Sequence, residues 1–305
     1  MSEGAVLDPT CVFKSVREMV RDAQNSVLFV SPFISSQLFE SILKEVDNNV
    51  QVTLVTRFRP DEIAKGLNSL KLYDVLRERG RGELRLSYHL HAKYYRADDS
   101  VILGSGNLTN KGLNTFPGGN HEIMIQVDRS FVGIDQFESR ILTESIVPSE
   151  ENIADLSEMV ENLKLIAIDR KNQLVPSVEF RSESPSDWMP ICESPSSVFN
   201  VYLNDLREID QKVVQDAKID LTYLSIPAGI DEEQFKKYIR IVIQQSGIMS
   251  AFKIELDRNR KLDKVIGIEI IEKKFDRGRE EAEKLWFSSI NWLAYFFPEK
   301  FEIKS

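Results

Sequence analysis

The chain has 305 residues, which at roughly 100–200 residues per domain predicts two domains. Its 42% of hydrophobic and 29% of charged residues are ordinary for a folded protein and exclude a disordered or fibrous chain. The net charge of -9 excludes coating of nucleic acid through bulk charge, while a local basic patch stays compatible with the sequence. Two cysteines and three histidines exclude a disulfide framework, a four-cysteine zinc site and a histidine-rich metal centre.

The sequence carries no signal for export or for a membrane span. Its first residues, Met-Ser-Glu-Gly-Ala, include an acid and lack the basic and apolar regions of a secretory signal. The longest uncharged, mostly apolar stretch, residues 285–297, is shorter than the roughly 20 apolar residues of a membrane-spanning helix. We therefore expect a cytoplasmic protein with free cysteines and no membrane partner.

The first 130 residues alternate between helical and strand patterns. Helices are predicted where apolar residues recur at helical spacing, over residues 12–23, 38–46 and 61–79. Strands are predicted from β-branched runs and alternation at residues 26–31, 50–56, 83–95 and 101–103, with a further strand beginning at Glu122. Strands separated by helices favour an α/β sheet with crossovers, and we assign residues 1–148 to this domain.

The remaining residues, 149–305, are predicted to form a smaller α+β domain. Helices are expected at residues 151–171, after an Asp231 cap, and at residues 277–295, with strands at 219–226 and a hairpin of 251–256 with 265–271. A stretch rich in Ser and Pro, residues 181–197, is typical of a loop or linker. The aromatic residues of the last helix are more typical of a buried core than of a lipid-facing surface.

One cluster of polar residues stands out at residues 91–107. It reads His91-x-Lys93-x4-Asp98-x5-Gly104-Ser105-Gly106-Asn107. On the predicted strand His91 and Lys93 are two residues apart, so both side chains would project to the same face. Here the sequence resembles the phospholipase D-like superfamily, whose signature is a His-x-Lys-x4-Asp element followed by Gly-Ser-x-Asn.

The resemblance implies a mixed sheet flanked by helices and a phosphodiesterase that works without a metal or cofactor. It implies that His91 attacks phosphorus and forms a phosphohistidine, with Lys93, Ser105 and Asn107 stabilising the charged phosphorane. A carboxylate at the position of Glu122 would orient the catalytic histidine. For substrate binding we name Gly104 and Gly106, whose backbone can approach a ligand closely, together with Lys111 and Arg57. Asp98 is predicted to be a structural anchor in its turn.

The motif occurs once, because no histidine follows His121. The reaction needs a nucleophilic imidazole on one side of phosphorus and an acid on the other. Members of the superfamily with one motif use two chains, so the resemblance implies a homodimer in which two His91 side chains meet across the two-fold axis.

The sequence indicates the class of phosphodiester substrate only through its charge distribution and a second resemblance. Residues 51–96 hold an excess of Arg and Lys over Asp and Glu, which is typical of a polyanion track, although a solvated helix face explains it equally well. The single-motif half resembles restriction and anti-phage defence endonucleases. The sequence therefore favours a DNA nuclease, with RNA left open and the second domain serving DNA recognition, oligomerisation or docking onto a partner such as an ATPase. A phospholipase or small-molecule phosphodiesterase and an inactive nucleic-acid-binding or protein-binding member are the alternatives.

Overall fold

The computed structural model describes residues 4–116, 118–170, 188–259 and 262–298. The chain divides into two compact units, Met1–Lys164 and Leu165–Ser305. This division falls within helix α6 (Glu150–Arg170), whereas the boundary predicted at residues 148 and 149 lies before that helix.

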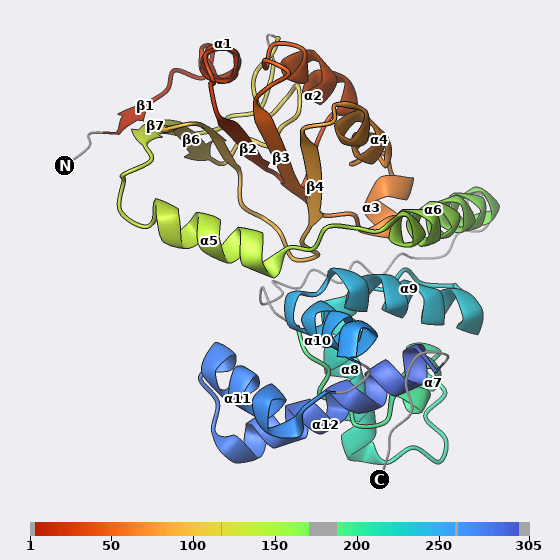
Figure 1. The fold of residues 1–305 in the computed structure, drawn as a ribbon. Helices are drawn as coiled ribbons and strands as arrows, with labels where there is room; N and C mark the ends of the chain where they lie inside the picture. Colours follow the sequence, from red (N-terminus) through yellow and green to blue (C-terminus); the bar gives the residue numbers. More distant parts are fainter. Residues whose placement is uncertain (1–3, 117, 171–187, 260–261, 299–305) are drawn as a thin grey trace. The chain divides into compact units, whose positions relative to one another are not determined.

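The N-terminal unit is built on a seven-stranded mixed sheet in the order β1-β7-β6-β5-β2-β3-β4 (Figure 1). Its strands are β1 (Ala5–Val6), β2 (Ser26–Val30), β3 (Gln51–Thr56), β4 (Gly82–Leu86), β5 (Tyr94–Ala97), β6 (Ser100–Gly104) and β7 (Met124–Asp128). Strands β2, β3 and β4 are parallel, and every other pairing is antiparallel. Because Val30 pairs with both Val55 and Tyr94, the carboxyl ends of the parallel strands and the start of β5 share one end of the sheet.

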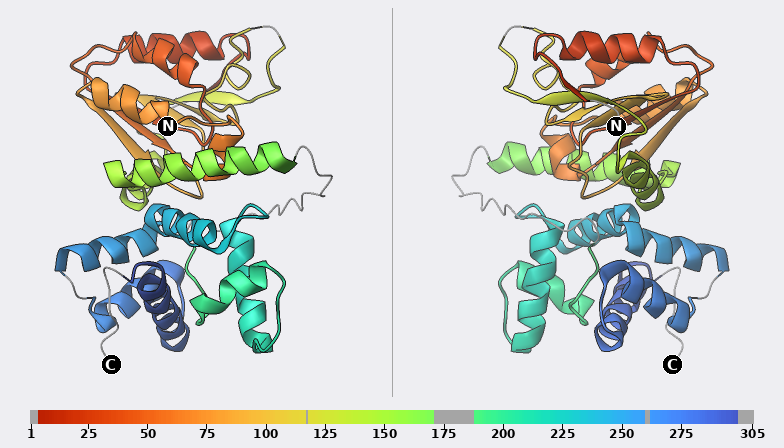
Figure 2. Two further views of the ribbon diagram at one scale, coloured as in Figure 1. Left: turned by 90° about the vertical axis from the view of Figure 1, so that its right-hand side faces the viewer. Right: turned by 90° about the vertical axis from the view of Figure 1, so that its left-hand side faces the viewer.

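Helices cover both faces of this sheet. Figures 1 and 2 show α1 (Val12–Arg21), α2 (Ser36–Leu43) and α4 (Lys71–Glu78) on one face and α5 (Ile134–Glu144) on the other. Helix α1 buries Val12, Val16, Met19 and Val20, the residues that recur at helical spacing in the sequence. The predicted α/β class and flanking helices of this part of the chain are confirmed.

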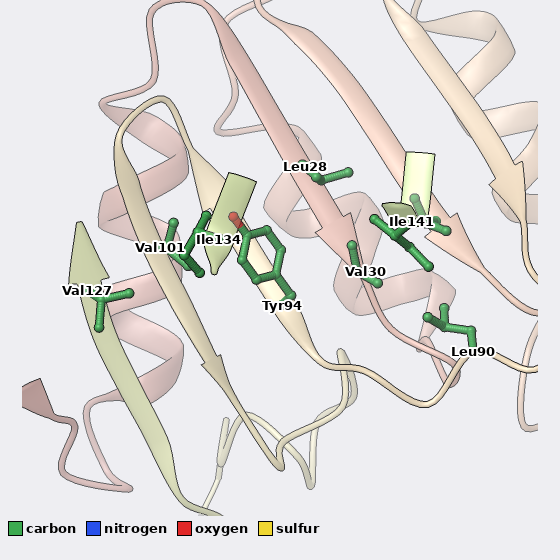
Figure 3. Packing of buried hydrophobic residues seen from close by; sticks show 9 residues of the cluster. Leu28, Val30, Leu90, Tyr94, Val101, Val127, Ile134 and Ile141 are labelled. Atoms are coloured by element: carbon green, nitrogen blue, oxygen red, sulfur yellow. The ribbon is translucent and has the colours of Figure 1, made fainter. Parts of the chain in front are cut away.

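The core on the α5 side joins residues from five strands, the helix α5 and one connecting segment. Ile134 and Ile141 of α5 pack with Leu28, Val30, Val55, Leu90, Tyr94, Val101 and Val127 (Figure 3). Leu90 belongs to the segment between β4 and β5, so burial of this side chain holds that segment against the sheet.

Two predicted elements of the N-terminal unit are each split. The helix predicted over residues 61–79 is α3 (Pro60–Ala64) followed by α4, because Gly66 turns the chain with a φ of 77°. The strand predicted over residues 83–95 is β4 and β5, separated by residues 87–93. Alternation in the sequence continues through this segment because Tyr88 and Leu90 are buried, although their backbone leaves the sheet.

The described part of the C-terminal unit is helical, so the predicted α+β character is wrong. Its elements are η1 (Pro195–Ser197), α7 (Val198–Tyr202), α8 (Gln211–Leu224), α9 (Glu232–Gln245), α10 (Gly247–Asn259), α11 (Lys264–Phe275) and α12 (Arg279–Phe296). The predicted strand lies in α8 and its C-terminal turn, and the two hairpin arms lie in α10 and α11.

Helix signals outweigh β-branched composition in this unit. Asp263 caps α11 by accepting hydrogen bonds from the backbone N–H groups of Val265 and Ile266. Helix α9 begins with a capping box between Asp231 and Gln234, as the cap at Asp231 predicts.

The aromatic residues of the last helix lie mainly in the core. Trp286, Trp292, Phe296 and Phe297 are buried, while Phe287 is exposed. Among the described residues, no helix combines the length and the apolar character that crossing a membrane requires.

The segment before α7 is packed rather than solvated. Residues 181–187 of the predicted loop lie outside the described residues, but Trp188, Met189 and Cys192 are buried. The Asp220 carboxylate of α8 accepts hydrogen bonds from the Trp188 indole and from the backbone of Cys192. The Trp292 indole of α12 donates to the Cys192 carbonyl. Two helices therefore fix this segment in place.

Candidate active site

His91 and Lys93 lie just before β5, at the end of the sheet where β2, β3 and β4 finish. The imidazole is exposed, whereas Lys93 is 9% exposed. Lys93 Nζ lies 3.4 Å from each ring nitrogen of His91 and donates a 2.5 Å hydrogen bond to the His91 carbonyl oxygen. The prediction that both residues lie on one face of a strand is wrong, because β5 begins after them at Tyr94. The contact still brings the ammonium and the imidazole together.

The charges around His91 favour its neutral form. The Lys93 ammonium, burial and the Arg57 guanidinium together hold the pKa of His91 below its ordinary value. A neutral imidazole has a free nitrogen lone pair, which a nucleophile requires. Burial and Arg57 lower the pKa of Lys93, while the nearby Glu122 carboxylate raises it.

The two glycines of the motif allow two segments to pack closely. A Cβ on Gly104 would lie 2.0 Å from the Ile123 carbonyl oxygen, and one on Gly106 would lie 2.5 Å from that of Gly112. The Gly104 N–H also donates to the Lys93 carbonyl at 3.2 Å. Gly104 and Gly106 thus join the Lys93 segment to residues 105–123, in addition to the ligand approach predicted for them.

Ser105 and Glu122 form a polar group beside Lys93. Ser105 Oγ donates a 2.5 Å hydrogen bond to Glu122 Oε2 and accepts one from the Ile123 N–H at 3.0 Å. Asn120 donates to Glu122 Oε1 at 3.0 Å. Within the described chain, Glu122 is therefore held by Ser105 and Asn120 rather than placed on the His91 ring that it was predicted to orient.

Asn107 and Lys111 continue the same connection between β6 and β7. The Asn107 Oδ1 atom is buried without a hydrogen-bond partner among the described residues. Lys111 is exposed, and its carbonyl oxygen accepts the Asn120 N–H at 3.0 Å. Asn107 and Lys111 therefore belong to the polar connection that carries Ser105 and Glu122.

Asp98 lies at the opposite end of β5, in the turn before β6, where its φ is 46°. Its carboxylate accepts hydrogen bonds from the backbone N–H groups of Gln24, Asn25 and Ser26 at 2.6 to 3.0 Å. Burial alone would raise the pKa of Asp98, but these bonds hold it below the ordinary value. The third residue of the motif thus anchors the start of β2 and does not reach His91.

Arg57 is half-buried beside the site and is already engaged. Its guanidinium makes a two-pronged ion pair with Glu62, with atom separations of 2.9 and 2.6 Å. Its Nη1 also donates to the Leu90 carbonyl oxygen at 3.1 Å. Arg57 was predicted to bind substrate directly. In the structure its side chain instead binds the backbone carbonyl of Leu90, the residue before His91.

Other basic residues of the region 51–96 also serve the fold. Arg79 donates to backbone carbonyls after α2, including those of Val46 and Asp47. Arg85 donates to the carbonyls of Leu142 and Ser145 at the end of α5. Arg96 is buried in an ion pair with Glu138. The excess of positive charge in the sequence therefore does not form a continuous track of uncommitted side chains.

Two charged residues near His91, Glu62 and Arg59, were not singled out by the sequence. Glu62 pairs with Arg57, and Arg59 donates to the Tyr88 carbonyl oxygen at 3.2 Å. His89 is largely buried, and burial with the charges of Arg59 and Arg57 lowers its pKa to about 3. No motif in the sequence marks Glu62 or Arg59.

Comparison with known proteins supports the assignment of this fold. Residues 16–141 match the family described as "Cardiolipin synthase, PLD-like domain". No curated protein matches the sequence.

Three solved structures resemble this chain at low sequence identity. NucT from Helicobacter pylori is 13% identical, with a TM-score of 0.40 over 48% of this chain and 100% of that one. The archaeal chromatin protein TrmBL2 is 21% identical, with a TM-score of 0.32 over 45% of this chain and 50% of that one. Nuc from Salmonella typhimurium, a phospholipase D family member, is 17% identical, with a TM-score of 0.36 over 47% of this chain and 91% of that one.

The family match spans the sheet from β2 to β7 and the whole stretch from His91 to Asn107. Residues 16–141 of this protein are therefore similar to a phospholipase D-like domain.

Proposed function

We propose that this protein is a metal-independent nuclease that hydrolyses DNA through a phosphohistidine on His91, in a site completed by a second copy of the chain. The observation that carries the proposal is the exposed His91 imidazole with the Lys93 ammonium 3.4 Å from its ring nitrogens. This arrangement places a neutral nucleophile beside a cation that can bind a non-bridging phosphate oxygen.

The reaction has two steps that balance in atoms and protons. In the first, a His91 ring nitrogen attacks phosphorus, the phosphorus–oxygen bond to the leaving group breaks, and that oxygen takes a proton from a second, protonated imidazole. In the second, the same imidazole accepts a proton from water, whose oxygen attacks phosphorus and releases His91. Lys93 stabilises the negative charge on the phosphoryl oxygens in both steps.

The second imidazole is the reason for proposing a homodimer. His89 is largely buried with its pKa near 3, so it is a poor general acid at neutral pH. His91 of the partner subunit would supply the acid across a two-fold axis. The negative phosphodiester between the two rings favours protonation of the second one.

Two observations lead us to propose DNA rather than lipid as the substrate. The connection between β6 and β7 presents the exposed polar residues Asn110, Lys111 and Asn120 beside the motif. The aromatic residues that would form a lipid-binding surface on α12 are mostly buried in the core. A cytoplasmic restriction or anti-phage role is part of the same proposal, with the helical C-terminal unit as the module that contacts DNA or a protein partner such as an ATPase.

The test compares the wild-type protein with His91→Ala in the presence of chelator. The substrates are labelled DNA, labelled RNA and phosphatidylcholine vesicles, from which the release of choline is measured. His121→Ala is the matched control, because His121 is also exposed. We expect DNA cleavage by the wild-type protein and the control and a loss of about 10³-fold or more in His91→Ala. Cleavage that needs added Mg²⁺, or that survives in His91→Ala, would refute the mechanism, and choline release alone would reassign the substrate to lipid.

A further inference from the structure

The segment that carries His91 is held from one side by two arginines. Arg57 and Arg59 follow β3, and each donates to a backbone carbonyl of residues 87–93. Arg57 Nη1 reaches the Leu90 carbonyl at 3.1 Å, and Arg59 Nε reaches the Tyr88 carbonyl at 3.2 Å. The two bonded residues flank His89, and Leu90 directly precedes His91. These two bonds are therefore placed to fix the backbone from which the imidazole projects.

Both arginines are themselves constrained. The Arg57 side chain is 11% exposed and the Glu62 side chain 10% exposed, and their two-pronged pairing fixes the plane of the guanidinium. The Arg57 guanidinium also lies 4.8 Å from the centre of the Phe33 ring, and that of Arg59 lies 4.6 Å from the Tyr88 ring. A guanidinium held on three sides is a rigid support for the carbonyl that it binds.

We propose that Arg57 and Arg59 are positioning residues for His91, which they act on through the Leu90 and Tyr88 carbonyls, and that Glu62 keeps Arg57 in this pose. The catalytic consequence of this positioning rests on the proposed function, whereas its effect on the His91 imidazole does not.

The charge of Arg57 gives the arrangement a second, measurable effect. Lys93 and Arg57 are the charged groups that lower the pKa of His91, and Glu122 acts on Lys93. Arg59 and Arg57 both act on His89. Loss of the Arg57 charge should therefore raise the pKa of His91. Loss of the Glu62 charge, which leaves Arg57 uncompensated, should lower it.

Kinetic measurements distinguish this role from direct substrate binding. An arginine that binds a phosphate in the ground state contributes mainly to KM, and its loss weakens the salt dependence of binding. An arginine that positions the nucleophile contributes mainly to kcat, because a shift of about 1 Å at the reacting atoms can cost about 10²-fold.

The test uses the full chain and four variants. Arg57→Lys keeps the charge but loses the fork. The double variant Arg57→Met with Glu62→Gln removes the buried pair without leaving a lone charge, and Glu62→Gln alone removes the anion. Arg79→Lys is the matched control, because Arg79 also donates to backbone carbonyls. Arg79 precedes the start of β4, whereas His91 lies at the end of the sheet where β4 finishes.

Nuclear magnetic resonance of labelled imidazoles gives the pKa of His91 in each variant without any substrate. We expect it to move up in the double variant, down in Glu62→Gln and not at all in Arg79→Lys. In the activity assay we expect Arg57→Lys to lower kcat by about 10²-fold with KM little changed. If one of the Glu62 variants does not fold, the other still fixes the sign of the shift.

Two results would overturn the inference. One is an unchanged His91 pKa in both Glu62 variants. The other is a rise in KM with normal kcat in Arg57→Lys, which would assign Arg57 to substrate binding instead. If the wild-type protein cleaves no phosphodiester but the two pKa shifts appear with opposite signs, the proposed nuclease function fails while the coupling of the Arg57–Glu62 pair to His91 stands.

Discussion

The two ends of strand β5 carry the charged residues of one sequence motif in opposite situations. At one end the Asp98 carboxylate receives three backbone N–H groups from the start of β2. At the other end Lys93 faces the His91 ring. Burial and the Arg57 charge lower the pKa of Lys93, and the Lys93 charge, burial and Arg57 lower that of His91. One motif therefore combines Asp98, whose charge the fold satisfies, with Lys93, whose charge faces the imidazole that would attack a ligand.

The same contrast separates three arginines of the region 51–96 from Lys93. Arg57, Arg79 and Arg85 use their fork-shaped donors on backbone carbonyls and serve the fold. Lys93 has one recorded backbone acceptor, the carbonyl of His91, and otherwise faces the imidazole. A count of positive residues in the sequence therefore overstates the charge that is free to meet a polyanion.

The largest effect is expected from Lys93→Met, which keeps the length of the side chain but removes its charge. We expect kcat on DNA to fall by about 10³-fold, because the charge that stabilises the phosphoryl oxygens is lost. The measurement is steady-state cleavage with thermal unfolding in parallel. Lys71→Met is the control, since Lys71 is an exposed lysine paired with Glu40. Equal rates in the two variants would break the contrast between the ends of β5.

Asp220→Asn extends the comparison to the helical unit. The Asp220 carboxylate is 0% exposed and accepts hydrogen bonds from Trp188, Ile191 and Cys192. An amide presents an N–H to one of these donors, so we expect a loss of about 3 kcal/mol in the free energy of unfolding. Asp216→Asn, one turn earlier on α8, should change stability by less than about 0.5 kcal/mol. Chemical denaturation measures both, and equal losses would show that these buried bonds contribute little.

A smaller effect is expected from Asp98→Asn. Asparagine tolerates the left-handed backbone conformation that residue 98 adopts in the turn. We expect a loss of about 1–2 kcal/mol, because the bonds to a charged acceptor weaken, while the kcat of the folded protein stays near normal. The control is the neighbouring exposed Asp99→Asn. A loss of activity larger than the loss of folded protein would place Asp98 in the catalytic step after all.

The pH dependence of stability sharpens this prediction. Because the pKa of Asp98 is lowered in the folded chain, its contribution is complete above the pKa of the unfolded chain and is lost as pH falls through the folded value. The difference in stability between the wild-type protein and Asp98→Asn should therefore shrink in acid. Denaturation measured from neutral pH down to strongly acidic pH gives this difference directly, and a constant difference would contradict the assignment.

Much of the N-terminal unit could be predicted from the sequence, because its signals are local. The run of apolar residues that ends at Pro32 forms β2, and the helical spacing of Val12, Val16 and Val20 forms α1. The motif located His91 and Lys93 without any structure. The break of the strand at residues 87–93 was missed because burial of Tyr88 and Leu90 preserves alternation outside the sheet.

The remaining differences depend on particular side-chain contacts that the pattern of residue types does not reveal. Ile266, Ile268 and Ile271 have β-branched side chains, yet the cap at Asp263 and the close packing of Gly267 on Trp286 place them in α11. The pairing of Arg57 with Glu62 joins a strand end to a short helix and leaves no pattern in the sequence. Glu122 was assigned to His91 by resemblance, whereas its position depends on Ser105 and Asn120.

The most direct test of the central claim is to trap the covalent intermediate. Labelled DNA is mixed with the wild-type protein in chelator, the reaction is stopped with denaturant at short times, and peptides are analysed by mass spectrometry. The proposed mechanism predicts a phosphoryl-linked DNA fragment on the peptide that contains His91, absent in His91→Ala and formed and lost at rates consistent with turnover. Rapid DNA cleavage by the wild-type protein with no adduct on His91 at any time would contradict it.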